Sequence, residues 1–372
     1  MAELPICYNK EKEALTMELK LDTSKTYAIA LEGGGAKGAY EIGVWKALEQ
    51  AGVKYNAVSG TSVGALNGAL MTMRDLTRGI ACWRDIHLNK VMDLGALSED
   101  DVKQMMSGQF ENMSLTDIFG KALDIVRNRG LDVAPLRAWV REVVDVKRVK
   151  ESDVQLYIST VSITDRKGLE VHVNELPEDQ ICDMLLASAY HPSFRLEKLG
   201  GKYYTDGGFV DSLPLHALVE AGYKDIIAVR IPGIGHERKF KMPDDVNLTV
   251  IHSWSDLGHV LNFDSEQARR DIEIGYLDGK RALYGLAGHK YYMEREMTER
   301  EALAWILDHQ VGGAICLREF LEEELPRQAK HFELENWDYY DLMTCLLEQR
   351  AEQKGIDPLE IRKDRELVDL AE

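Results

Sequence analysis

The chain has 372 residues, 45% of them hydrophobic and 29% charged, which is typical of a globular protein with one large domain and an appended piece, or with two domains. Its formal net charge of −18 at pH 7 argues against nucleic acid as a partner. The sequence has no apolar run of the ~18 residues that a membrane-spanning helix needs, and its N-terminus lacks the apolar stretch of a signal peptide. We therefore expect a cytoplasmic protein.

The N-terminal part of the sequence predicts alternating strands and helices. Residues 26–31 and 55–59 are short apolar runs typical of buried strands. Residues 39–51 repeat apolar side chains at helical spacing and are followed by Gly52, a common residue after a helix C-terminus. Residues 65–73 continue as an apolar helix. This β-α-β-α order predicts an α/β fold with a mostly parallel central sheet and helices on its faces.

The remaining sequence extends this pattern and then changes character. Residues 76–146 are predicted to be mostly helical, and we interpret them as a layer that covers one sheet face or forms one wall of a substrate groove. Further strands are predicted at 154–163, 169–173, 225–231 and 246–251, and further helices at 181–188, 215–221 and 265–284. The chain thus divides into an N-terminal extension at 1–24, an α/β domain at 25–290 and an acidic helical C-terminal module at 297–372.

Two glycine-rich turns lie close together near the N-terminus. The first is Gly33-Gly34-Gly35-Ala36-Lys37-Gly38, between a predicted strand and a predicted helix. It also fits the dinucleotide fingerprint Gly-x-Gly-x-x-Gly, but that fingerprint requires a carboxylate after the second strand, and none is present there. We therefore interpret the loop as an oxyanion hole, because glycines let main-chain N–H groups face a substrate and the helix N-terminus favours negative charge.

The second turn, Gly60-Thr61-Ser62-Val63-Gly64, has the Gly-x-Ser-x-Gly pattern of a nucleophile elbow. A predicted strand precedes it and a predicted helix follows, so Ser62 is the candidate nucleophile. An α/β-hydrolase would add an acid and then a histidine. The downstream histidines are His191, His216, His252, His259 and His289, and none lies in a recognisable motif. Ser62 also follows only the second predicted strand, whereas an α/β-hydrolase builds most of its sheet before the elbow.

A third motif, Asp206-Gly207-Gly208, offers a carboxylate at a turn. The three motifs, in this order, resemble the patatin-like phospholipase family. The segment Ala187-Ser188-Ala189-Tyr190-His191-Pro192-Ser193-Phe194 resembles the family's Ala-Ser-x-x-x-Pro-x-Phe block. These matches span about residues 27–214 and leave the C-terminal module outside the resemblance.

The resemblance implies that residues 25–290 are a patatin-like catalytic domain, in which helices sandwich a mostly parallel sheet. It implies a Ser–Asp dyad, with Ser62 as nucleophile and Asp206 as general base, and no metal or cofactor. The loop from Gly33 to Gly38 would supply the oxyanion hole. The further residues that carry the motifs are Gly60, Gly64, Pro192, Gly207 and Gly208.

One position departs from the family's pattern. Where the family usually has Asn two residues before the proline, this chain has Ser212, and Asp211 adds a second carboxylate. Asp211 either perturbs the base or caps the following helix.

The expected substrates are phospholipids, lysophospholipids or simpler acyl esters, with reversible peripheral contact to a membrane. Two alternatives stay open: a non-catalytic or regulatory protein on the same scaffold, and a carboxylesterase with a Ser-His-Asp triad.

Overall fold

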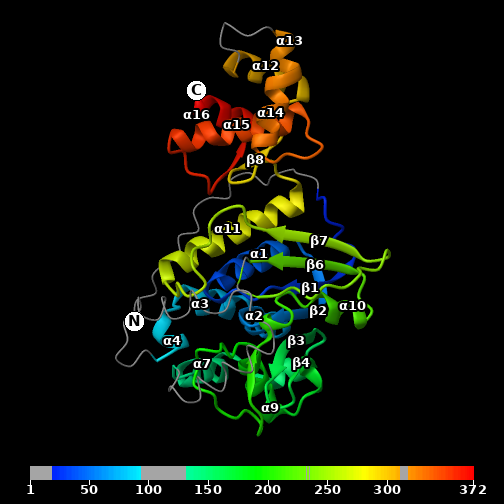
Figure 1. Cartoon of the computed structure of the whole chain (residues 1–372), viewed down its shortest axis with the longest axis vertical. Coiled ribbons are helices and arrows are strands. Elements are labelled where there is room, and N and C mark those ends of the chain that lie inside the picture. Colours follow the sequence, from blue (N-terminus) through cyan, green and yellow to red (C-terminus); the bar gives the residue numbers. More distant parts are fainter. Residues whose placement is uncertain (1–18, 94–130, 232, 234, 311–316) are drawn as a thin grey trace.

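A seven-stranded sheet forms the centre of the larger part of the chain (Figure 1). This computed structural model describes residues 19–93, 131–231, 233, 235–310 and 317–372. The strands follow the order β4-β3-β2-β1-β6-β7, and β5 pairs with β3. They are β1 (Thr26–Leu31), β2 (Lys54–Thr61), β3 (Gln155–Ser162), β4 (Lys167–His172), β5 (Tyr204–Asp206), β6 (Asp225–Arg230) and β7 (Asn247–His252).

The sheet is mostly parallel, as the alternation of strands and helices predicts. β1 pairs in parallel with β2 and β6, β2 with β3, and β6 with β7. Among the described strands of this sheet, only β4 and β5 run antiparallel, and both pair with β3. The carboxyl ends of β1 and β2 therefore lie side by side, and this edge carries both glycine-rich turns.

Helices cover both faces of this sheet. The helices of the α/β part are α1 (Ala39–Gln50), α2 (Val63–Thr72), α3 (Leu76–Arg84), α4 (Leu88–Val91), α7 (Ala134–Val143), α8 (Val146–Glu151), α9 (Glu178–Ser188), α10 (Leu215–Glu220) and α11 (Ser265–Tyr284). Ile29 and Leu31 of β1 join the large core built with α1, α2 and α11. Ala28 and Ala30 face the other way, into a smaller core with Leu218 of α10. The period of two along β1 thus supplies one core on each face.

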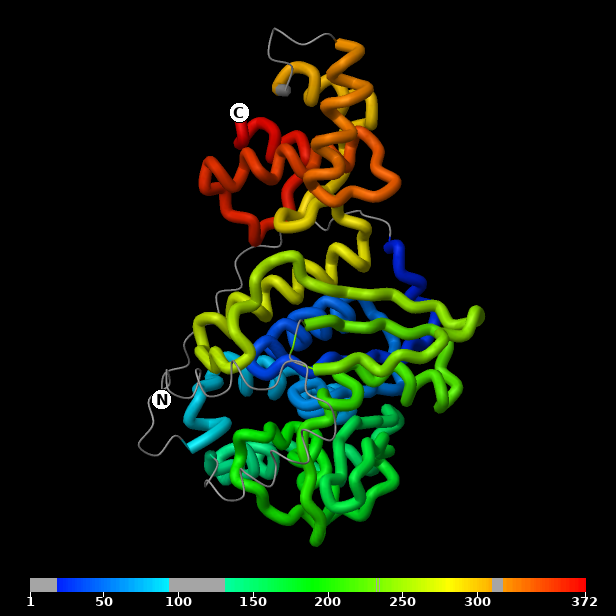
Figure 2. The backbone as a smooth tube through the Cα atoms, viewed as in Figure 1, coloured from blue at the N-terminus to red at the C-terminus, as the bar shows by residue number. Residues whose placement is uncertain are grey.

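Small residues allow α1 and α11 to pack closely. A Cβ on Gly43 would lie 2.0 Å from the carbonyl oxygen of Ile272, and one on Gly275 would lie 2.0 Å from that of Tyr40. Neither position admits a larger side chain without moving a backbone. Figure 2 shows α11 (yellow) lying alongside the shorter α1 (blue).

The C-terminal elements enclose a second hydrophobic core and lie beyond α11 at one end of the molecule (Figure 1). They are β8 (Tyr292–Glu294), α12 (Glu299–Gln310), α13 (Leu317–Glu319), the π-helical turn η4 (Phe320–Glu324), α14 (Leu325–His331), α15 (Tyr339–Gln353), β9 (Ile361–Lys363) and α16 (Asp364–Ala371). β8 and β9 form a small parallel sheet. The division of the chain at residues 290 and 297 stays a prediction, and most of the 1–24 extension lies outside the described residues.

Two buried carboxylates join the C-terminal elements to the α/β part. Asp278 of α11 accepts hydrogen bonds from the hydroxyls of Tyr40 and Tyr292, each at 3.0 Å, and pairs with Arg281. Glu348 of α15 accepts the three consecutive main-chain N–H groups of residues 289–291, at 2.7–2.9 Å. Asp278 therefore has partners on both sides of the junction, and Glu348 holds the segment that leads out of α11.

Several predicted boundaries shift by a few residues in the structure. β2 runs to Thr61 instead of residue 59, and α2 begins at Val63 instead of residue 65, so the elbow is tighter than the pattern indicates. Of the predicted helical layer at 76–146, residues 94–130 lie outside the described residues. In the part of the chain that the structure describes, no helix is both long and apolar enough to cross a membrane.

Candidate active site

Ser62 occupies a sharp turn between β2 and α2. Its φ of 56° and ψ of −122° place a non-glycine residue in a region that L-residues rarely adopt. The turn depends on its two flanking glycines. A Cβ on Gly60 would lie 2.2 Å from the carbonyl oxygen of Gly64, and one on Gly64 would lie 2.6 Å from that of Leu31. This is the backbone geometry that the Gly-x-Ser-x-Gly pattern predicts.

Asp206 is the last residue of β5 and lines the same pocket as Ser62. The Gly208 N–H donates a hydrogen bond to Oδ1 of its carboxylate at 2.8 Å, and the Ser62 side chain lies beside the same carboxylate in the pocket. The carboxylate is only 9% exposed. Burial raises the pKa of Asp206 from 3.8 to about 6, and the neighbouring Ser62 side chain and the Gly208 N–H partly oppose that rise. The structure thus brings together two residues that are far apart in the sequence.

The first glycine loop is held by carbonyl groups from distant segments. The Gly33 N–H donates to the Ser212 carbonyl oxygen at 2.9 Å, and the Ala36 N–H donates to the Val260 carbonyl oxygen at 2.7 Å. The Lys37 N–H turns back to the Gly34 carbonyl oxygen at 3.3 Å. These three amides are already engaged, so they are poor donors for a substrate.

Two other amides of the same loop remain available. The N–H groups of Gly34 and Gly35 have no hydrogen-bond partner among the described residues, and both glycines line the pocket beside Ser62. The Val63 N–H, at the first position of α2, is likewise unpartnered within the described part of the chain. Val63 was not singled out in the sequence, although the residue after an elbow serine commonly supplies an oxyanion donor.

Ser188 is a further residue that the sequence motifs did not single out for a role. It is the last residue of α9, its side chain is fully buried, and its Oγ accepts the main-chain N–H of Ser62 at 3.0 Å. Its place in the Ala-Ser block was the only available signal.

Asp211 does not cap the following helix. α10 begins at Leu215 after Pro214 and has no side-chain cap. Instead, the Asp211 carbonyl oxygen accepts the Thr61 hydroxyl at 2.7 Å, next to Ser62. Its carboxylate is buried, and burial raises the pKa of Asp211 to about 7. Asp211 therefore braces the elbow through its backbone.

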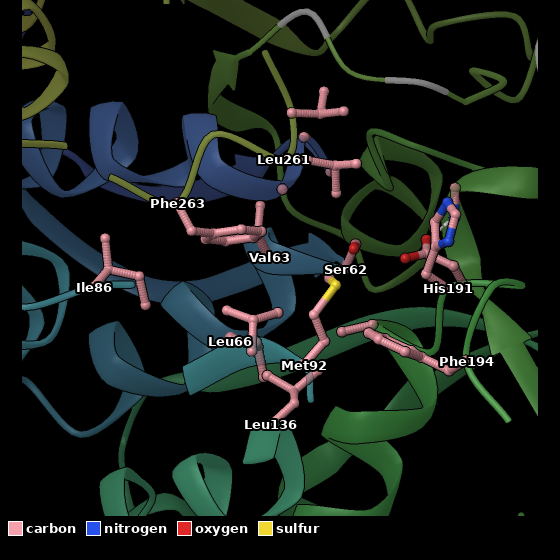
Figure 3. A pocket seen from close by; sticks show the side chains of 18 of the residues that line it. Ser62, Val63, Leu66, Ile86, Met92, Leu136, His191, Phe194, Leu261 and Phe263 are labelled. Carbon is pink, nitrogen blue, oxygen red and sulfur yellow. Dashed lines mark hydrogen bonds between the residues drawn. The ribbon is translucent and has the colours of Figure 1, made fainter. Parts of the chain in front are cut away.

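An apolar pocket opens next to Ser62 and Asp206 (Figure 3). It contains about 1070 Å³ of empty space, part of it open to solvent. Figure 3 shows Leu66, Met92 and Leu136 on one side of Ser62, with His191 and Phe194 on another. The pocket-lining residues from the predicted helical layer are Trp83, Ile86, Val91, Met92, Leu136 and Trp139. The described part of that layer thus forms a wall of the pocket.

Among the described residues, one histidine lines the pocket, and another lies between two acidic side chains away from it. Of the histidines in the described residues, His191 lines the pocket, and its Nδ1 lies 2.8 Å from the Ser193 hydroxyl. Burial lowers the pKa of His191 to about 4, so its ring is neutral at pH 7. Glu170, His216 and Glu220 lie close enough to hold a metal ion, but the two ring nitrogens face different carboxylates, and these residues do not line the pocket.

The sequence model of the family described as "Patatin-like phospholipase" matches residues 29–219, just over half of the chain. The fold is the α/β type with a mostly parallel sheet between helices, and the chain belongs to the patatin-like phospholipase family.

Among curated relatives, the neuropathy target esterase sws of Drosophila melanogaster is 26% identical over 213 residues, covering 56% of this chain and 13% of that protein. Patatin-like phospholipase domain-containing protein 6 of Mus musculus is 27% identical over 216 residues, covering 56% of this chain and 14% of that protein. The matched region is thus only about a seventh of these relatives. Among solved structures, VipD from Legionella pneumophila aligns with a TM-score of 0.42 at 14% identity, over 69% of this chain and 66% of that chain.

Proposed function

We propose that this chain is a serine esterase that releases fatty acid from phospholipids or lysophospholipids, with Ser62 as nucleophile and Asp206 as general base. The observation that carries the proposal is the placement of Ser62, on its strained turn, beside a buried Asp206 in one apolar pocket. Membership of the patatin-like phospholipase family supports a lipid acyl substrate. The word esterase in the name of one relative, neuropathy target esterase, supports an ester bond as the bond that is cleaved.

In the first half of the proposed reaction, Asp206 accepts the Ser62 hydroxyl proton while Oγ attacks the ester carbonyl carbon. The carbonyl oxygen becomes an oxyanion and accepts hydrogen bonds from the N–H groups of Gly34 and Gly35, with Val63 as a third donor. Of the six residues from Gly33 to Gly38 that were predicted to form the oxyanion hole, the proposal uses Gly34 and Gly35, whose N–H groups have no hydrogen-bond partner among the described residues. The alcohol or lysolipid leaves with the proton that Asp206 returns.

In the second half, water hydrolyses the acyl-enzyme. Asp206 takes a proton from the water, hydroxide adds to the acyl carbon, and the Ser62 alkoxide recovers that proton as the fatty acid leaves. A pKa near 6 suits both roles, because the carboxylate is ionised at pH 7 yet is a stronger base than an exposed aspartate. The apolar pocket would hold the acyl chain, which places the head group towards solvent and makes contact with a membrane peripheral.

The test compares wild type with Ser62→Ala and Asp206→Asn on p-nitrophenyl esters and on phosphatidylcholine vesicles. Each substitution is expected to lower kcat by at least ~100-fold, and a fluorophosphonate probe is expected to label wild type at Ser62. Equal activity of all three proteins refutes the dyad. A wild type that neither hydrolyses esters nor reacts with the probe supports the non-catalytic scaffold. Loss of activity in His191→Gln as large as in Ser62→Ala supports a triad.

A further inference from the structure

Ser188 connects the nucleophile to the central sheet through one hydroxyl group. Its Oγ accepts the main-chain N–H of Ser62 at 3.0 Å, and its O–H donates to the carbonyl oxygen of Ser159, on β3, at 2.7 Å. The side chain is fully buried, so water does not compete for either partner. Ser188 thereby links the Ser62 backbone to β3, which lies between β4 and β2 in the central sheet.

The same Ser159 carbonyl also borders the base. A Cβ on Gly207 would lie 2.1 Å from this oxygen, so the main chain next to Asp206 packs directly against it. β3 also pairs with β5, and Asp206, the last residue of β5, lies opposite Thr160 in that ladder. Ser159 and Thr160 of β3 thus help to position both Ser62 and Asp206, which come from different parts of the sequence.

The hydrogen bond to the Ser62 N–H matters because the elbow is strained. A serine with a φ of 56° keeps this conformation only where its surroundings over-determine it. Among the described residues, Ser188 is the partner of this N–H. The position demands a group that accepts one hydrogen bond and donates another, which a hydroxyl does and an apolar side chain cannot.

We propose that Ser188 is a positioning residue for acyl transfer: it fixes the Ser62 backbone relative to Asp206, so that Oγ can reach the base as it approaches the ester carbonyl. Ser188 does not line the pocket and makes no contact with substrate in this role. The proposal rests on the proposed esterase function, because it assigns Ser188 to the geometry of that reaction.

The experiment measures kcat, KM, the rate of fluorophosphonate labelling and Tm for Ser188→Ala and Ser188→Cys. Ser59→Ala is the matched control, since Ser59 is equally buried on β2 but its hydroxyl has no hydrogen-bond partner among the described residues. We expect Ser188→Ala to lower kcat and the labelling rate by about 10- to 100-fold with KM within about twofold, because only the alignment of the nucleophile changes. Ser188→Cys, which retains a weak donor and acceptor, is expected to fall between Ala and wild type.

The outcomes separate the two proposals. If wild type is active and Ser62→Ala is not, but Ser188→Ala keeps the kcat of wild type, then the positioning role is refuted and the esterase stands. If Ser188→Ala and Ser59→Ala lose kcat and Tm equally, the loss is general packing and the positioning role is again refuted. If wild type shows neither turnover nor labelling, the esterase proposal itself fails. Should Ser188→Ala not fold, the Cys variant and its labelling rate decide.

Discussion

Replacing the base with its neutral analogue should stabilise the protein while it removes activity. Burial raises the pKa of Asp206 from 3.8 to about 6, so the folded protein holds this proton more tightly than the unfolded chain does. Below pH 3.8 the carboxyl group is protonated in both states and carries no penalty. The penalty grows as the pH rises from there to about 6, and it is complete above that pH. At about 1.4 kcal/mol per pH unit, it amounts to about 3 kcal/mol.

Asp206→Asn removes this penalty and keeps an oxygen that can accept the Gly208 N–H. We therefore expect the variant to exceed wild type in free energy of unfolding by up to about 3 kcal/mol at pH 8, and by roughly half of that at pH 5. Urea unfolding at pH 5, 6, 7 and 8 measures the difference. Asp165→Asn is the control of opposite sign: Asp165 pairs with Lys202 and its pKa is lowered, so this variant should lose stability at pH 8. A difference between Asp206→Asn and wild type that does not change with pH would refute the reasoning.

Three further predictions concern the rate, the glycine loop and the C-terminal junction. kcat/KM should rise about tenfold per pH unit below pH 6 and level off above it, as Asp206 loses its proton, and a pH–rate profile on a p-nitrophenyl ester checks this. Gly35→Ala should lower kcat by about 100-fold or more, because a Cβ there would lie 2.2 Å from the Val260 carbonyl oxygen, whereas Gly52→Ala, with a similar φ but nothing within 4 Å, should leave kcat unchanged. Glu348→Ala should cost roughly 2–4 kcal/mol of stability in urea unfolding without changing kcat, since it leaves three N–H groups without an acceptor, and Glu348→Gln should cost less.

Local motifs were sufficient to predict the backbone turn at Ser62, the candidate nucleophile. The Gly-x-Ser-x-Gly pattern between a strand and a helix encodes the turn at Ser62, because the small flanking residues are what the close contacts require. The β-α-β-α order was likewise sufficient to predict the mostly parallel sheet, because alternating strands and helices favour parallel pairing. Asp206 needed more than its own turn signal, since only the order of several motifs pointed to its meeting Ser62.

The parts of the site that the sequence did not predict depend on contacts between distant segments. In the sequence, all six residues of the first glycine loop were equal candidates for the oxyanion hole. In the structure, the N–H groups of Gly33 and Ala36 donate to the carbonyl oxygens of Ser212 and Val260. No periodicity or spacing reveals those pairings. Ser188 is similar, because a buried serine at a helix end reads as ordinary packing until its hydrogen bonds are known.

The junction between α11 and the C-terminal elements limits how the chain can be shortened. A fragment that ends near residue 290 would lose Tyr292 and with it one of the two tyrosine hydroxyls on Asp278, and it would lose the Glu348 carboxylate that collects the N–H groups of residues 289–291. The cut would leave Asp278, in the last two turns of α11, with Tyr40 and Arg281 as its partners among those described above, next to the start of α1. The C-terminal elements therefore supply hydrogen-bond partners that the C-terminal part of α11 and the residues after it need. A shortened protein would need a substitute for Tyr292 to remain well folded.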